Sequence, residues 1–252
     1  MARATDLMLE VRDVLEYLTT SCEADIAEIQ SLLNFKSRFI DTWFTNCVLL
    51  WTQMPHATYV ADQATWRSVG RDIIGLGLDY LKPWHIDSLS AGVSVNLKGA
   101  LVWDISQTYQ IEGGPVDVGL KREAMGDTAL YTLARDFLDA MNMPPFVRHI
   151  DRWEGRVVRI HEPEMLLRRA ASILLRQLSV GISEEKVEME SEAVAYIVCR
   201  SHGVTPNHLE GRSIFRQRVS DMLRSLMRAD LVCNIIANGL QHLEIYDMKI
   251  PA

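Results

Sequence analysis

An acidic helix start at residues 188–196 is the stretch whose residue types come nearest to metal chemistry. It reads Glu188-Met189-Glu190-Ser191-Glu192-Ala193-Val194-Ala195-Tyr196. Such a helix supplies the last, acidic ligand of helical zinc sites, whose two histidines stand four residues apart on the preceding helix. The preceding predicted helix contains the run LRRAASILLRQ at residues 167–177, which has no histidine. The sequence therefore raises the question of whether this chain is an enzyme, a former enzyme or neither.

A second short run begins like the zinc motif HExxH but departs from it. His161-Glu162 is followed by Pro163, and the fifth residue is Met165. Proline is excluded from a regular helix interior and is favoured at the first helical position, so we interpret this run as the loop that leads into a helix. A metal site that combines His161 with Glu190 or Glu192 stays open as an alternative.

The composition is that of a globular protein of one large or two small domains. The chain has 252 residues, of which 48% are hydrophobic and 23% are charged. It contains no apolar run near eighteen residues and no basic, then apolar leader, which argues against a membrane span and a secretory signal. The four cysteines have no CxxC pairing and are expected to be reduced core thiols. We expect a cytoplasmic protein.

The net charge of −7 is concentrated in the first half of the chain. Residues 1–120 contain 8 Lys and Arg against 15 Asp and Glu, whereas residues 121–252 contain 18 of each. Because phosphate neutralisation dominates affinity for nucleic acids, an acidic first half argues against non-specific DNA binding there.

The hydrophobic periodicity predicts an α+β fold that is predominantly helical with a small β-sheet. We expect one or two helices over residues 7–33, a helix over 35–51, a brief helix over 62–69 and two short strands within 92–104. The run Gly113-Gly114-Pro115 predicts a boundary. Beyond it we expect a helical stripe over 130–141, a strand at 157–160, and helices over 164–178, 183–202 and 212–240.

Four segments, in order, resemble the ArdC-type antirestriction proteins. They are Asn46-Cys47-Val48-Leu49-Leu50-Trp51-Thr52-Gln53-Met54-Pro55-His56-Ala57-Thr58-Tyr59-Val60, Trp66-Arg67-Ser68-Val69-Gly70-Arg71, Val102-Trp103-Asp104-Ile105-Ser106-Gln107-Thr108 and Glu190-Ser191-Glu192-Ala193-Val194-Ala195-Tyr196-Ile197-Val198-Cys199. The resemblance implies an N-terminal helical extension (1–35), an ArdC-N-like domain (36–115) and a zincin-like domain of the ImmA/IrrE metallopeptidase type (116–252).

The resemblance also implies a metal site, and this chain departs from it. When Glu190 takes the place of the acidic ligand, the two histidines and the glutamate of HExxH fall on Arg169, Ile173 and Ala170, none of which can coordinate zinc. Glu190 could instead pair with Arg169. We therefore expect no intact metal site, no cofactor and no catalytic residue.

The resemblance associates the N-terminal half with single-stranded DNA. Candidate contacts to nucleic acid or another ligand are Asn46, Gln53, Trp66 and Arg71, followed by the arginines Arg148, Arg152 and Arg156. The alternative for the polar residues at element ends is a turn or cap role. The loop after Arg71 also lacks the lysines that would contact phosphates.

We therefore expect a non-catalytic, ArdC-like interaction protein of mobile-element, phage or defence biology, which binds a protein or single-stranded DNA. One alternative is a single-stranded DNA-binding protein that acts through residues 36–115. Another is a metallopeptidase with non-standard zinc ligands. The broad apolar stripe of the last helix makes a homodimer conceivable.

Overall fold

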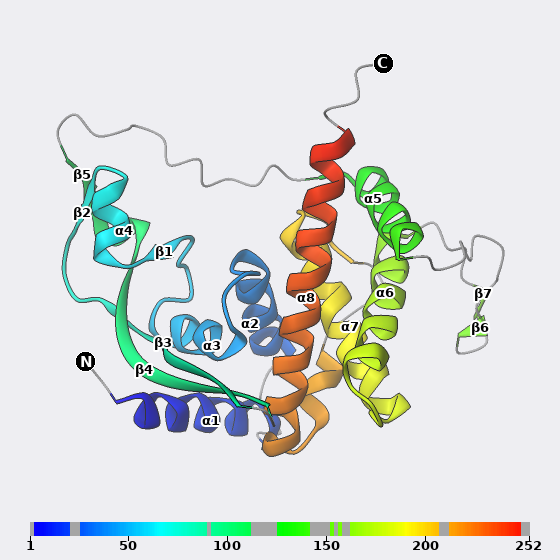
Figure 1. Ribbon diagram of the computed structural model, residues 1–252, viewed down its shortest axis with the longest axis horizontal. Helices are drawn as coiled ribbons and strands as arrows, with labels where there is room; N and C mark the ends of the chain where they lie inside the picture. Colours follow the sequence, from blue (N-terminus) through cyan, green and yellow to red (C-terminus); the bar gives the residue numbers. More distant parts are fainter. Residues whose placement is uncertain are drawn as a thin grey trace. The chain divides into compact units, whose positions relative to one another are not determined.

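The computed structural model describes residues 3–20, 26–89, 92–111, 125–141, 152–153, 156–157, 162–206 and 212–247. The chain divides into two compact units, each built from two separate stretches of sequence. Unit 1 comprises Met1–Ala24 and Thr42–Lys121, and unit 2 comprises Asp25–Asp41 and Arg122–Ala252. The described elements are mostly helices, with small antiparallel sheets, which confirms the expected α+β class (Figure 1).

Unit 1 contains a long antiparallel hairpin. Its strands are β3 (Leu78–Leu89) and β4 (Gly92–Asp104), with β1 (Val60–Ala61) on the other edge of β4. A separate ribbon pairs β2 (Arg71–Ile73) with β5 (Thr108–Gln110). The expectation of two short strands within residues 92–104 was wrong. Instead, β4 is one continuous strand, because it remains paired with β3 on both sides of Gly99, which lies opposite Leu81.

The helices of unit 1 are α1 (Ala4–Thr20), α3 (Phe44–Gln53) and α4 (Gln63–Ser68). Helix α1 buries an apolar stripe at helical spacing and packs against α3, β3 and β4 (Figure 1). The members of this stripe are Leu7, Val11, Leu15 and Leu18. Helix α4 confirms the brief helix expected at 62–69. Asp62 caps it by accepting a hydrogen bond from the Thr65 amide at 2.9 Å.

Unit 2 is a helical assembly centred on α7. Its helices are α2 (Ile26–Arg38), α5 (Asp127–Ala140), α6 (Pro163–Leu178), α7 (Glu184–Ser201) and α8 (Val219–Asp247), accompanied by β6 (Arg152–Trp153), β7 (Arg156–Val157) and the 3-10 helix η2 (Arg212–Arg216). Helix α7 packs against α2, α6 and α8, and the long α8 runs beside α5, α6 and α7 (Figure 1). A Cβ at Gly239 of α8 would lie 2.2 Å from the Phe137 ring, so glycine permits the close approach of α5 and α8.

The first fifty residues fold differently from the sequence expectation. The expected extension over residues 1–35 is divided, because α1 belongs to unit 1 and α2 to unit 2. The single helix expected over 35–51 is interrupted, since α2 ends at Arg38 and α3 begins at Phe44. Lys36 explains the stop: its Nζ donates to the carbonyl oxygens of Phe39 and Ile40 at 3.3 and 2.7 Å, satisfying groups beyond the helix end.

The helices expected over 164–178 and 183–202 are present as α6 and α7, with Ser183 capping α7 as predicted. The last expected helix is split into η2 and α8. The strand expected at 157–160 is represented by β7, and residues 158–160 lie outside the described part. None of the described helices combines the length and the apolar character needed to cross a membrane.

Candidate functional site

Helix α6 carries the positions at which the resemblance places the zinc motif. Ala170 is buried in the core, whereas Arg169 and Ile173 are half-buried. Pro163 begins the helix, as the sequence predicted. His161, the histidine of the alternative metal site, lies outside the described residues.

Glu190 of α7 is completely buried and is bound by an arginine from α8. Arg228 donates from Nε to Oε2 at 3.0 Å and from Nη2 to Oε1 at 2.5 Å, which is the bidentate geometry that guanidinium and carboxylate favour. The hydrogen bond with Glu190 raises the pKa of Arg228 above its ordinary value. The sequence suggested Arg169 as the partner of this carboxylate. The structure gives that role to Arg228, because α8 packs directly against α7.

The residues at these positions do not fit a metal ion. Arg169, Ala170 and Ile173 offer no lone pair, and both oxygens of Glu190 are engaged by a cation. Among the residues that the structure describes, no three or more His, Cys, Asp or Glu side chains are grouped so that they could hold a metal. We therefore derive no metal-dependent step from this arrangement.

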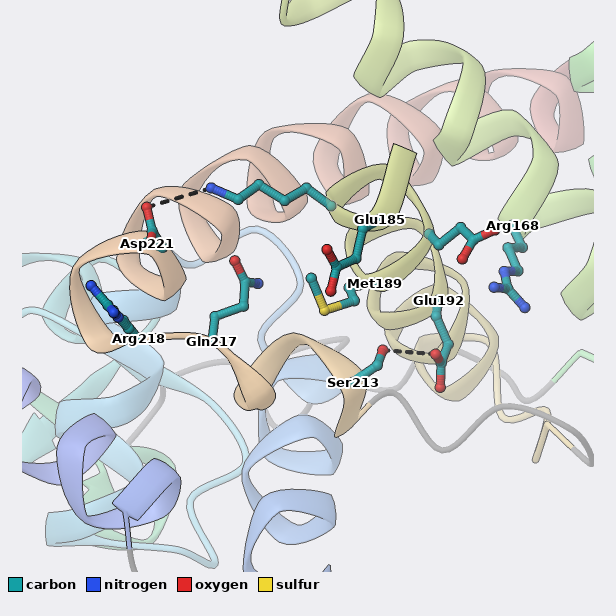
Figure 2. A pocket seen from close by; sticks show the side chains of 10 residues that line it. Arg168, Glu185, Met189, Glu192, Ser213, Gln217, Arg218 and Asp221 are labelled. Carbon is teal, nitrogen blue, oxygen red and sulfur yellow. Dashed lines mark hydrogen bonds and ion pairs between the residues drawn. The ribbon is translucent and has the colours of Figure 1, made fainter. Parts of the chain in front are cut away.

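A pocket of about 550 Å³ opens in unit 2 beside α7 (Figure 2). Its walls come from α6, α7, η2 and the start of α8, and its lining residues are Arg168, Glu185, Lys186, Glu188, Met189, Glu192, Ser213, Gln217, Arg218 and Asp221. Four of these are acidic and three are basic. The lining contains no histidine or cysteine, so it lacks the side chains that most often serve as general base and thiol nucleophile. Charged side chains therefore dominate this lining.

Hydrogen bonds hold several walls of this pocket in place. The Ser213 hydroxyl donates to Glu192 Oε2 at 2.7 Å, and Lys186 Nζ lies 3.4 Å from Asp221 Oδ1 (Figure 2). Gln217 is held by Ser225, which does not line the pocket and which donates to Gln217 Oε1 at 3.1 Å. The pocket is therefore lined by side chains whose positions are set by their neighbours.

Hydrogen bonds through Ser225 and Gln217 connect the Glu190–Arg228 ion pair with this pocket. Arg228 donates to Ser225 Oγ at 3.2 Å, and Ser225 in turn binds Gln217. Sequence reasoning singled out neither Arg228 nor Gln217. The available signal was weak: Arg228 is a charged residue between Leu226 and Ala229, both of which face the core.

In unit 1, the two candidate amide ligands hold the edge of the sheet. Asn46 Nδ2 donates to the Leu81 carbonyl at 2.9 Å, and the Leu81 amide donates to Asn46 Oδ1 at 2.8 Å. Two turns along α3, Gln53 binds the carbonyl and amide of Asp79 at 3.2 and 2.8 Å. These amides pair with β3 as a neighbouring strand would, so they stabilise α3 on the hairpin. The geometry gives them a structural role.

Trp66 and Arg71 are also engaged within unit 1. Trp66 is fully buried, its indole Nε1 donates to the Trp103 carbonyl at 2.9 Å, and its ring packs edge-on against Tyr59. A base cannot stack on a ring that is inside the core. Arg71 donates from Nε to Thr108 Oγ1 at 2.7 Å and from Nη2 to the Thr108 carbonyl at 3.3 Å, joining β2 to β5.

Asp104, at the end of β4, acts as a cap, which is the alternative that the sequence analysis gave for polar residues at element ends. Asp104 is buried and accepts hydrogen bonds from the amides of Thr58, Tyr59 and Ser106 and from the Ser106 hydroxyl. Burial alone would raise the pKa of Asp104, but these donors hold it below its usual value.

Of the three candidate arginines in the second half, Arg148 lies outside the described residues. Arg152 and Arg156 belong to the short β6–β7 hairpin, in which Arg152 is opposite Val157 and Arg156 is opposite Trp153. The structure describes their backbone pairing but not their side chains, so their role as contacts stays a prediction.

No protein-family model and no curated protein matches the sequence. Two crystal structures of the antirestriction protein ArdC from the R388 plasmid are similar in fold. The Mn(II)-bound structure has 16% identity and a TM-score of 0.53, covering 94% of this chain and 97% of that chain. The chain has an ArdC-like fold. The metal-free ArdC structure has 17% identity and a TM-score of 0.48, covering 79% of this chain and 83% of the ArdC chain.

Proposed function

We propose that this chain is a non-catalytic protein of the antirestriction type, which acts by binding a partner. The proposal combines the ArdC-like fold with the residues at the implied metal positions. It includes the assignment of residues 36–115 as ArdC-N-like and of residues 116–252 as a degenerate metallopeptidase domain of the ImmA/IrrE type, with α2 added to the second. A cytoplasmic location and a homodimer remain predictions of the sequence.

The ion pair between Glu190 and Arg228 carries this proposal. The sequence resemblance puts Glu190 at the position of the acidic ligand, and ArdC itself has been crystallised with Mn(II). A buried carboxylate needs a compensating positive charge, and Arg228 supplies it permanently through two hydrogen bonds. With no donor at Arg169, Ala170 or Ile173, hydrolysis at this position has no metal-bound water to use.

The partner that we favour is a protein. Asn46, Gln53, Trp66 and Arg71 are the first-half residues that were candidates for DNA contacts, and all four bind other parts of unit 1. The acidic balance of residues 1–120 also opposes phosphate binding. The pocket in unit 2, by contrast, presents charged groups at its surface.

The first test is the metal content of purified, tag-free protein that has been dialysed against buffer containing equimolar Zn²⁺ and Mn²⁺ and then against metal-free buffer. We expect far less than one metal ion per chain. Near-stoichiometric zinc or manganese would overturn the assignment and would point to His161 with Glu190 or Glu192. Glu190→Gln is the matched variant, since any metal bound at this position should disappear with the carboxylate.

The second test separates protein from nucleic acid as partner. A fluorescent 30-nucleotide single strand is titrated at about 50 and 200 mM salt, where electrostatic binding to several phosphates changes by orders of magnitude. We expect no saturable change in anisotropy at either salt concentration. Saturable binding that fades steeply with salt would replace the protein partner by single-stranded DNA.

A further inference from the structure

We propose that η2 (Arg212–Arg216) is a strap that closes one side of the α7 pocket, and that two hydrogen-bonded links to α7 hold it there. The strap is part of the pocket wall, because Ser213 belongs to η2 and Gln217 follows it directly, and both line the pocket (Figure 2). The inference goes beyond the proposed function, since it concerns how the pocket is shaped and needs neither a metal nor a partner.

The position of η2 depends on its side chains. A 3-10 helix of five residues has poorer hydrogen-bond geometry than an α-helix, so its own backbone fixes it weakly. Ile214 and Phe215 are buried and anchor the middle of η2 in the core, whereas Ser213 and Gln217 face the pocket. How firmly this wall of the pocket is closed therefore depends on what Ser213 and Gln217 bind.

The first link from η2 to α7 is direct. The Ser213 hydroxyl donates to Glu192 Oε2 at 2.7 Å (Figure 2). A hydrogen bond to a charged acceptor is stronger than one between neutral groups, so this contact holds the beginning of η2 on α7.

The second link runs through α8 to the buried ion pair. Gln217 Nε2 donates to the Ile214 carbonyl at 3.2 Å, and Gln217 Oε1 accepts from the Ser225 hydroxyl at 3.1 Å. Ser225 Oγ accepts from Arg228 Nη2 at 3.2 Å, and Arg228 binds Glu190 of α7. Each donor along this link points from the cation toward η2, so each hydrogen bond polarises the next.

The two links reach η2 by separate routes. Glu190 and Glu192 are two residues apart, which places them roughly 200° apart around the axis of α7. The second link depends on Ser225, which is completely buried, so water does not readily replace its partners when the hydroxyl is removed. We therefore expect the links to contribute independently, and the loss of either to let η2 open while α7 and α8 stay packed.

The test is hydrogen–deuterium exchange of the full chain, measured by mass spectrometry on peptides that span residues 212–218. Ser213→Ala breaks the first link, and Ser225→Ala breaks the second while the Glu190–Arg228 pair stays in place. Each variant should speed exchange in 212–218 by about fivefold, as the loss of one hydrogen bond implies, and the double variant by about the product of the two. Exchange in the centres of α7 and α8 should change by less than about twofold, because the opening is local.

Lys186→Met is the matched control. It removes the contact with Asp221, which belongs to the same pocket but does not involve η2, so exchange in 212–218 should stay at the wild-type rate. Unchanged exchange in 212–218 in both serine variants, an equal rise throughout unit 2, or the same rise in Lys186→Met would each overturn the inference. The proposed function is tested separately, because metal content decides it whatever the exchange of η2 shows.

Discussion

Unit 1 fixes its sheet edge with neutral amides, whereas unit 2 joins its helices through buried ion pairs. In unit 1, Asn46 and Gln53 replace a missing strand beside β3. In unit 2, Glu190 binds Arg228 between α7 and α8, and Lys36 binds Asp230 between α2 and α8 at 2.6 Å. An amide loses less hydration on burial than a charge does, so the two units should respond differently when one partner is removed.

The difference also concerns which side chains each unit uses for its own contacts. The amide and aromatic side chains that first drew attention in unit 1 all bind backbone groups of that unit. In unit 2, the innermost carboxylate is neutralised by the chain itself, and other carboxylates of the same helix are left at a pocket. Helix α7 therefore carries one carboxylate that is enclosed by its own chain and others that line a pocket.

The largest expected effect comes from removing the cation of the fully buried pair. Lys36→Met leaves Asp230 uncompensated and should lower the free energy of unfolding by about 3–5 kcal/mol, measured by urea denaturation. The double variant Lys36→Met/Asp230→Leu should recover most of this loss, because apolar residues of similar volume replace both charges. A single variant as stable as the wild type would show that this pair does not stabilise the packing of α2 on α8.

In unit 1, Asn46→Ala should cost about 2–4 kcal/mol, because it strands the amide and the carbonyl of Leu81 in the interior. Gln53→Ala is the matched control. Its contacts to Asp79 have the same pattern but are exposed, so water can replace them, and the loss should be about 1 kcal/mol. Equal losses at the two positions would contradict the distinction between a buried and an exposed edge contact.

The elements whose pattern is local were predictable from the sequence. Ser183 and the apolar stripe of α6 predicted two helices of unit 2, since caps and periodicity act within a few residues. The break after Arg38 was not predictable, because it depends on the hydrogen bonds from the Lys36 ammonium to the carbonyl oxygens of Phe39 and Ile40. The division of residues 1–35 between the units follows from contacts with β3 and α7, which lie far away in sequence.

In the candidate site, too, residue types could be predicted from the sequence, whereas contacts between residues far apart in the sequence could not. The residue types alone show that Arg169, Ala170 and Ile173 cannot coordinate zinc, whereas their correspondence to a zinc motif stays a prediction. The partner of Glu190 was not predictable, since Arg228 is 38 residues away and only the packing of α8 on α7 brings them together. The buried position of Trp66 was likewise set by its contact with Trp103 on β4, which no local pattern encodes.

Acid should weaken unit 1 through its capping carboxylates. The pKa of Asp104 is lowered in the folded state, as is that of Asp62, where Lys82 is the main cause. Such groups contribute stability that is complete above their unfolded pKa of about 3.9 and is lost as the pH falls through the folded pKa. Asp104→Asn should therefore cost about 1 kcal/mol at pH 7 and progressively less below about pH 4, measured by thermal unfolding across pH. A cost that is constant across this range would show that Asp104 acts through shape and not through charge.

The smallest expected effect tests whether burial, and not bidentate geometry, makes the guanidinium pairs of unit 2 important. Arg176 and Glu184 form the same two-bond arrangement as Arg228 and Glu190, but their side chains are 47% and 72% exposed, whereas Glu190 is fully enclosed. The hydrogen bond from Arg176 lowers the pKa of Glu184, yet water and salt screen this pair, so Glu184→Gln should leave the melting temperature unchanged within error at physiological salt. Glu190→Gln should lower it clearly under the same conditions, because Arg228 then loses its buried counter-charge. If the two variants had the same melting temperature, the exposed pair would be as important as the buried one, and burial would not explain the contribution of the Glu190–Arg228 pair to the packing of α7 on α8.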